Sequence, residues 1–158
     1  MYSPITIANY FIQKSIATGI ELTPMKLVKL VYIAHGWYLG LTKGKGLINE
    51  AVIAWDYGPV IESLYHSFKR YGRSQITAQE NIILGSNEGA PIDSSTQTFL
   101  DKIWQVYGGY SGLQLSALTH ENNTPWHIIY QQNRGKNTII PNNLIQQHYE
   151  SKANGSRK

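Results

Sequence analysis

The sequence of 158 residues contains no cysteine. This absence excludes a disulfide framework, a thiol nucleophile and any cysteine-ligated zinc or iron–sulfur site. It also suits a reducing compartment, so we expect a cytoplasmic protein. The chain lacks any apolar run near the ~20 residues that a membrane span needs. Its N-terminus lacks the basic stretch and apolar core of a signal peptide. These absences predict a compact, soluble chain with no membrane partner.

Basic residues exceed acidic ones only slightly, by 14 to 10. Three of the 14, Lys152, Arg157 and Lys158, fall in the segment 151–158, which contains no acid. Residues 1–150 therefore hold 11 basic and 10 acidic side chains and are nearly neutral. Because phosphate contacts supply most of the affinity of DNA-binding domains, this balance disfavours a nucleic-acid partner. We expect one domain, residues 1–150, followed by a disordered basic tail, residues 151–158.

The longest periodic segments predict helices. Residues 5–18 form the first, and Thr23-Pro24 starts a second at about residues 24–42, with a hydroxyl at the N-cap and a proline at the first helical position. Apolar side chains cover most of the circumference of this second helix, which predicts a position at the centre of the core. The strip left over consists of Lys26, Lys29, Ile33, Gly36, Gly40 and Lys43. A glycine costs about 1 kcal/mol relative to alanine in a helix. We therefore expect another element to approach closely at Gly36 and Gly40.

Short β elements and further helices follow. Residues 51–57 alternate as in a strand, and residues 82–84 and 138–140 are further strand candidates. Gly58-Pro59 is predicted to end the first strand and to start a third helix, on which Tyr65 faces inward. Later helices are predicted to start near Ser94, Ser111, Thr124 and Pro141, with capping-box spacing at Ser94/Gln97 and Ser111/Gln114. The predicted fold is mainly α: a compact bundle of about six or seven helices around the central helix 24–42, with a small β element.

Patterns that indicate catalysis are also lacking. Residues 43–46, Lys-Gly-Lys-Gly, follow a helix, whereas a phosphate-binding P-loop connects a strand to a helix. The histidines do not have metal-ligand spacing, and no Gly-x-Ser-x-Gly elbow marks a nucleophile. His120 is the remaining candidate for acid–base chemistry, but its place between two predicted helices favours a role in satisfying backbone groups. We predict no catalytic residue, no metal and no cofactor, and we do not expect an enzyme.

Residues 96–121 are the best candidate for contact with nucleic acid, because two predicted helices joined at Gly108-Gly109 are similar to a helix-turn-helix unit. Specific readers of DNA add basic phosphate contacts to their base contacts. The second helix offers no lysine or arginine, only Gln114, Ser116, Thr119 and His120. An αα-hairpin that closes the core is favoured, and a DNA-binding regulator stays as an alternative.

One ordered set of motifs runs through most of residues 5–150. It begins with the helical run 27–39, continues through Tyr57-Gly58-Pro59, and ends with a Leu-Thr-His block at 118–120 and with Pro125-Trp126. This set resembles the Panacea domain family, the SocA-like antitoxins. Its signature positions are Leu27, Lys29, Leu30, Tyr32, Gly36, Trp37, Tyr71, Gly72, Thr119, His120, Pro125 and Trp126.

The resemblance implies that residues 1–150 form a Panacea domain, and that the chain is the antitoxin of a bacterial or prophage toxin–antitoxin pair. Such a protein neutralises its cognate toxin by direct binding. One branch of the family acts differently and delivers its toxin to the ClpXP protease as an adaptor, so proteolytic delivery is an alternative. The family pattern supplies no catalytic residue, which agrees with the failed search for one.

The surface that meets the toxin is predicted around the turn after the first strand. Aromatic side chains dominate the hot spots of protein interfaces, and here they stand beside a turn and a polar helix face. The predicted contacts are Trp55, Asp56, Tyr57, Gly58 and Pro59, together with His66, Lys69 and Arg70 from the helix that follows.

Overall fold

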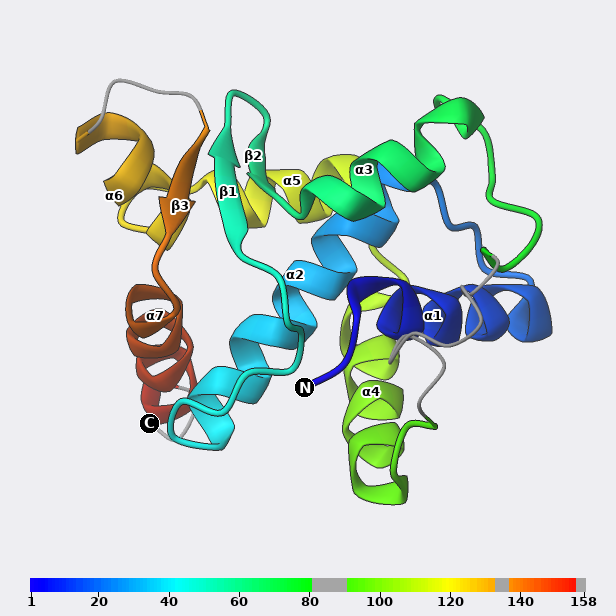
Figure 1. Ribbon diagram of the computed structural model, residues 1–158, viewed down its shortest axis with the longest axis horizontal. Coiled ribbons are helices and arrows are strands. Elements are labelled where there is room, and N and C mark those ends of the chain that lie inside the picture. The colour runs from blue at the N-terminus through cyan, green and yellow to red at the C-terminus, as the bar shows by residue number, and fades with distance from the viewer. Residues whose placement is uncertain (81–90, 133–136, 156–158) are drawn as a thin grey trace.

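The computed structural model describes residues 1–80, 91–132 and 137–155. Within these ranges the chain forms seven α-helices, one short 3-10 helix and a small antiparallel sheet of three strands (Figure 1). The elements are α1 Pro4–Thr18, α2 Pro24–Leu41, β1 Val52–Trp55, β2 Gly58–Val60, α3 Glu62–Phe68, η1 Lys69–Tyr71, α4 Ser94–Tyr107, α5 Gly112–His120, α6 Pro125–Gln132, β3 Thr138–Ile140 and α7 Asn142–Gly155. The prediction of a mainly α fold with a small β element is confirmed.

Helix α2 lies at the centre, as the apolar side chains around most of its circumference predicted. It runs diagonally through the molecule and contacts α1, α3, α4, α5, α7 and β2 (Figure 1). Thr23 is its N-cap and accepts a hydrogen bond from the backbone N–H of Lys26, while Pro24 occupies the first turn. Helix α2 is therefore the element on which most of the others pack.

The close approach expected at the two glycines of α2 is present, and the approaching element is α7. A Cβ on Gly36 would lie 2.2 Å from the ring of Tyr149, and a Cβ on Gly40 would lie 3.1 Å from the backbone N of Glu150. Trp37 packs edge-on against the same tyrosine, with 5.2 Å between the ring centroids. The glycines thus give α7 a groove in α2 into which one aromatic ring fits.

The two lysines at the start of that strip do not face solvent. Lys26 is 5% exposed and Lys29 is 3% exposed. The ammonium group of Lys26 donates hydrogen bonds to the backbone carbonyls of Glu21 and Gly108, at 2.7 and 2.5 Å. Burial lowers the Lys26 pKa. A lysine is buried at acceptable cost only where carbonyl or carboxylate acceptors meet its ammonium group, and here one acceptor, Gly108, lies 82 residues away in the sequence.

His35 connects three parts of the chain from the middle of α2. It is fully buried, and its Nδ1 accepts hydrogen bonds from the backbone N–H groups of Leu47 and Ile48, at 3.3 and 3.4 Å. Its Nε2 then carries the proton and donates to Asn142 Oδ1 at 3.1 Å. Burial lowers the His35 pKa, because removal from water penalises the charged ring.

The sheet has the order β2-β1-β3, with β1 antiparallel to both neighbours. The expectation that Gly58-Pro59 starts a helix is wrong: these residues form β2, which pairs with β1, and α3 begins only at Glu62. The prediction of a strand at residues 138–140 is confirmed by β3. The candidate strand at residues 82–84 lies outside the described residues.

Two predicted helix ends also differ from the structure. The N-cap of α4 is Asp93 rather than Ser94, and the Asp93 side chain accepts a hydrogen bond from the backbone N–H of Thr96. The predicted capping box of Ser111 and Gln114 in α5 is confirmed. Helix α7 continues to Gly155. Residues 151–155 of the tail expected to be disordered are therefore helical, and residues 156–158 lie outside the described residues.

Replacing Gly36 with alanine should destabilise the fold. The new methyl group collides with the Tyr149 ring, and overpacking of a filled core costs about 1–3 kcal/mol, which exceeds the gain of up to about 1 kcal/mol in helix propensity. Urea unfolding of Gly36→Ala measures the loss. The control is Gly155→Ala in α7, where a Cβ meets nothing within 4 Å. A Gly36→Ala protein as stable as the wild type contradicts this account of α2 and α7.

Candidate functional site

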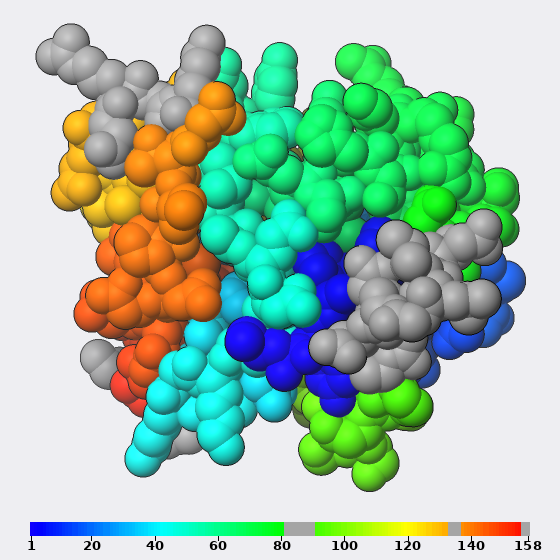
Figure 2. Space-filling model, viewed as in Figure 1, coloured from blue at the N-terminus to red at the C-terminus, as the bar shows by residue number. Residues whose placement is uncertain are grey.

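The most prominent surface feature is the tip of the β1–β2 hairpin. Strand pairing joins Trp55 to Gly58, so Asp56 and Tyr57 form the connection between the strands. Tyr57 is 75% exposed, although tyrosine is an amphipathic residue that usually buries its ring. Figure 2 shows the hairpin, in turquoise, projecting next to α3 at the upper edge of the molecule.

Lys29 of α2 holds this tip through hydrogen bonds to its backbone. Its ammonium group donates hydrogen bonds to the backbone carbonyls of Tyr57 and Pro59, at 3.2 and 3.0 Å. Because Lys29 is buried, its pKa falls to about 7. The side chain of one α2 residue thus joins both ends of the turn to the central helix.

Gly58 is required by the same arrangement. Its φ is +116°, in a region that favours glycine. A Cβ at this position would lie 2.9 Å from Lys29 Nζ and 2.9 Å from His120 Cε1. No side chain fits between the lysine and the histidine, so the backbone of the hairpin rests directly on both.

Three aromatic side chains hold the hairpin from its other side. The Trp126 indole N–H donates to the carbonyl oxygen of Trp55 at 2.6 Å. The Trp126 ring packs against His120 at 4.5 Å and stacks on Tyr130 at 4.7 Å. The Tyr130 hydroxyl donates to Asp56 Oδ1 at 2.5 Å. We call His120, Trp126 and Tyr130 the aromatic column.

Within the column His120 has a structural task. Its Nδ1 donates to the carbonyl oxygen of Ser116 at 2.7 Å, one turn earlier in α5. This is the role in satisfying the backbone that the sequence favoured over acid–base chemistry. Within the described residues, no group of three or more His, Cys, Asp or Glu side chains lies close enough to hold a metal ion. None of the described helices is long and apolar enough to cross a membrane.

An apolar groove of about 290 Å³ lies between the hairpin, the first turns of α2, and α3. Trp55 and Tyr65 pack edge to face on one wall, with 4.9 Å between their centroids. The groove is lined by Pro24, Met25, Val28, Lys29, Trp55, Tyr57, Val60, Tyr65, Lys69 and Gly72. Met25 and Tyr65 are 44% and 43% exposed, so this apolar surface is open to a partner.

The structure divides the predicted contact residues into three groups. Trp55, Tyr57 and Lys69 line the groove. Asp56, His66 and Arg70 are exposed outside its lining, and Arg70 forms an ion pair with Glu80 at 2.9 Å. Gly58 and Pro59 are buried and offer no surface.

The groove also contains residues that the sequence analysis did not select. Met25 and Val28 belong to the predicted central helix, and Tyr65 is predicted to face the core. The spacing of Tyr65 and Lys69 is the signal that could have found the wall, because residues four apart lie on the same helix face.

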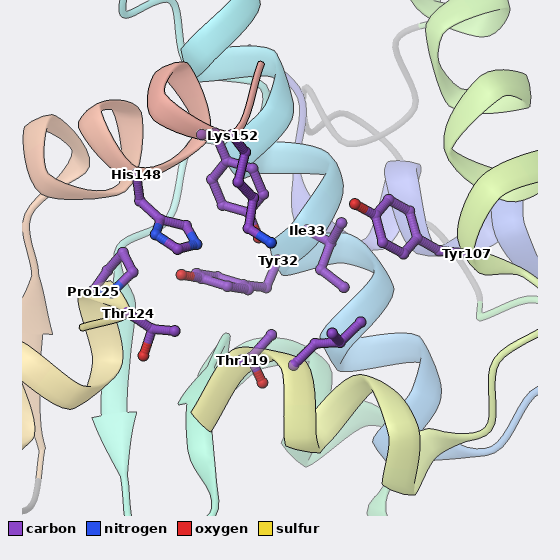
Figure 3. A pocket seen from close by; sticks show the side chains of 10 residues that line it. Tyr32, Ile33, Tyr107, Thr119, Thr124, Pro125, His148 and Lys152 are labelled. Carbon is purple, nitrogen blue, oxygen red and sulfur yellow. The ribbon is translucent and has the colours of Figure 1, made fainter. Parts of the chain in front are cut away.

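The family-signature positions at the other end of α2 belong to the core. Tyr32, Gly36 and Trp37 meet Tyr149 of α7, and burial raises the Tyr32 pKa. Figure 3 shows the side chains of Tyr32, Thr119, Thr124, His148 and Lys152 around the small cavity between these helices. Its volume is about 20 Å³, which is room for one water molecule rather than a cofactor.

Two comparisons with known proteins identify relatives. The family model for the antitoxin SocA-like Panacea domain matches residues 27–127, a range that includes Lys29, the hairpin, His120 and Trp126. Antitoxin SocA of Caulobacter vibrioides (strain NA1000 / CB15N) is 30% identical to the chain over 128 residues, which cover 78% of this chain and 68% of that protein. No solved structure shows a significant match.

The burial of Lys29 should make the chain more stable as the pH rises above neutrality. The Lys29 pKa is about 7 in the folded chain, against an ordinary value of 10.5. Between these values the unfolded chain binds the additional proton, so the free energy of unfolding rises with pH, by up to about 1.4 kcal/mol per unit. Lys29→Met keeps the apolar stem, removes the ammonium group and should flatten this rise.

Urea unfolding between about pH 7 and pH 9.5 measures the difference between the two proteins. Tyr10, whose pKa is raised to about 12 by burial and by Asp101, contributes the opposite slope at higher pH, which sets the upper limit of the window. An equal rise in the wild type and in Lys29→Met contradicts a depressed Lys29 pKa.

Proposed function

The chain belongs to the family of SocA-like antitoxins with a Panacea domain, and we propose that it neutralises a cognate toxin protein by binding it directly. The observation that carries the proposal is the placement of the family's signature residues. Lys29, His120 and Trp126 converge on the hairpin and hold its tip, with Tyr57, exposed beside an apolar groove. A surface fixed in this way suits recognition of another protein.

Rigidity is what favours binding at this surface. A partner need not order a flexible loop when it docks, so less of the interaction free energy is lost to conformational entropy. Exposed tyrosine and tryptophan side chains also contribute large contact areas at low entropic cost. In this proposal Trp55, Tyr57 and Lys69 contact the toxin from the groove, and Asp56, His66 and Arg70 surround it. Gly58 and Pro59 act only by shaping the turn.

Co-expression with the adjacent gene tests the proposal. We expect the adjacent gene alone to arrest growth, and we expect the chain to restore growth and to co-purify with the toxin as a stable complex. Loss of the toxin that depends on ClpXP, without a stable complex, means proteolytic delivery instead. Salt-sensitive binding to the promoter of its own operon, without binding to the toxin, means a DNA-binding regulator. Either of these two results overturns neutralisation by direct binding.

Reversing the charge of Lys69 should weaken the complex. Lys69 is exposed at the edge of the groove, where a charge mainly speeds association with a partner of opposite sign. For Lys69→Glu we expect a roughly fivefold weaker Kd, with most of the loss in the association rate. Surface plasmon resonance on the immobilised toxin measures both quantities.

The matched control is Lys45→Glu, since Lys45 is an exposed lysine in the turn after α2, at the opposite end of that helix from the groove. Its substitution should leave the association rate unchanged. Equal losses in the two variants indicate a general effect of net charge and remove Lys69 from the interface.

A further inference from the structure

The groove between α2, α3 and the hairpin indicates the chemistry of what binds there. Resting on the proposed function, we propose that it takes one large apolar side chain of the toxin, with a carboxylate beside that side chain in the toxin's chain. The shape of the groove determines the first part of this proposal, and the polar groups around it determine the second.

The apolar part follows from the lining and the size. Met25, Val28 and Val60 provide aliphatic surface, and Trp55 and Tyr65 provide an aromatic wall. A volume of about 290 Å³ holds one aromatic or large aliphatic side chain, but is at the lower limit for a drug-sized ligand. Each such side chain gains about 25 cal/mol per Å² of apolar area that it removes from water.

The carboxylate follows from the polar groups, all of which are donors or can donate. Among the described residues that line the groove, none is an aspartate or glutamate. Of its two lysines, Lys29 already donates to Tyr57 and Pro59, whereas Lys69 is exposed. No ion pair joins Lys69 to any described acid. The indole Nε1 of Trp55 is buried and has no hydrogen-bond acceptor within the described part of the chain. An unpaired buried donor is costly, so an acceptor brought to it by a bound partner would relieve a cost that the free chain bears.

The apolar surface also extends past the groove, which gives a longer segment room to follow. Met25 lies next to the start of α5, because a Cβ on Gly112 would be 3.5 Å from the Met25 side chain. Leu113, the next residue, is 76% exposed. Leu113 is thus an exposed apolar residue next in sequence to the one that approaches Met25.

Three capped dipeptides test this chemistry without the toxin. The probes are N-acetyl-Phe-Asp-amide, N-acetyl-Phe-Asn-amide and N-acetyl-Ala-Asp-amide, titrated to millimolar concentration into the ¹⁵N-labelled chain. We expect the first to shift the Trp55 indole N–H signal and to bind roughly two- to fivefold more tightly than the second. The third, which has no apolar anchor, should give no shift at Trp55. Lys69→Gln should remove the preference for Asp over Asn.

Two results overturn the proposal at this stage. The first is the absence of a shift at Trp55 with either phenylalanine probe. The second is equal affinity for the Asp and Asn probes in the wild type, which leaves an apolar pocket without the carboxylate preference.

A pair of variants carries the test to the complex. Met25→Glu puts a carboxylate into the groove and should weaken toxin binding by about tenfold or more. Leu41→Glu is its control, because Leu41 is 58% exposed and lies on the same helix, about 24 Å along the axis from Met25. The control should bind as the wild type does, and both variants should keep the wild-type circular dichroism spectrum.

Failure of the inference can be told apart from failure of the proposed function. If Met25→Glu still binds and neutralises the toxin, the groove is not the docking site, although the chain remains an antitoxin. If the dipeptide result holds but the wild type forms no complex with the product of the adjacent gene, the chemistry of the groove stands and neutralisation fails. If Met25→Glu loses its fold, Lys69→Gln with the dipeptides decides the matter alone.

Discussion

The arrangement of the proposed binding surface depends on one buried lysine side chain. Lys29 leaves water only because two backbone carbonyls of the hairpin, those of Tyr57 and Pro59, accept hydrogen bonds from its side-chain nitrogen. The dependence is mutual. Among the described residues, no other side chain of the central helix donates a hydrogen bond to both carbonyls of the turn. Gly58 follows from this contact, because any side chain there would collide with the lysine. A single buried amino group therefore determines the shape of a tip on which the exposed side chain of Tyr57 stands.

Periodicity and capping chemistry were sufficient to predict much of the fold. The apolar circumference of α2, its Thr23-Pro24 start and the Ser111–Gln114 capping box are local properties, and the structure shows each of them. The burial of Lys26 and Lys29, by contrast, does not follow from local sequence. A lysine on a helix is assigned to solvent unless acceptors are known, and their acceptors at Gly108 and Pro59 lie 82 and 30 residues away. The same limit explains why the strand at Gly58-Pro59 is not predicted from the sequence, because this strand exists only through its pairing with β1.

The hairpin residues of the candidate site could be predicted from the sequence, whereas most of the helix residues that line the groove could not. Trp55 and Tyr57 were selected because aromatic residues beside a turn are often exposed, and both line the groove. Met25, Val28 and Tyr65 belong to helices whose apolar residues are expected to enter the core. The groove remains open above them, so part of that apolar surface meets solvent. Whether the apolar residues of a helix are fully covered depends on the tertiary arrangement, and helix periodicity does not predict it.

The insertion of Tyr149 into the glycine groove of α2 also has a consequence in time. The two helices meet through contacts such as His35 with Asn142, which are 107 residues apart. At roughly 5–20 residues per second, a ribosome needs about 5 to 20 s to make the chain between them. During that interval the central helix has left the ribosome without its partner, and its apolar face is accessible to proteases and chaperones. The groove of α2 therefore stays unfilled until Tyr149 has been synthesised.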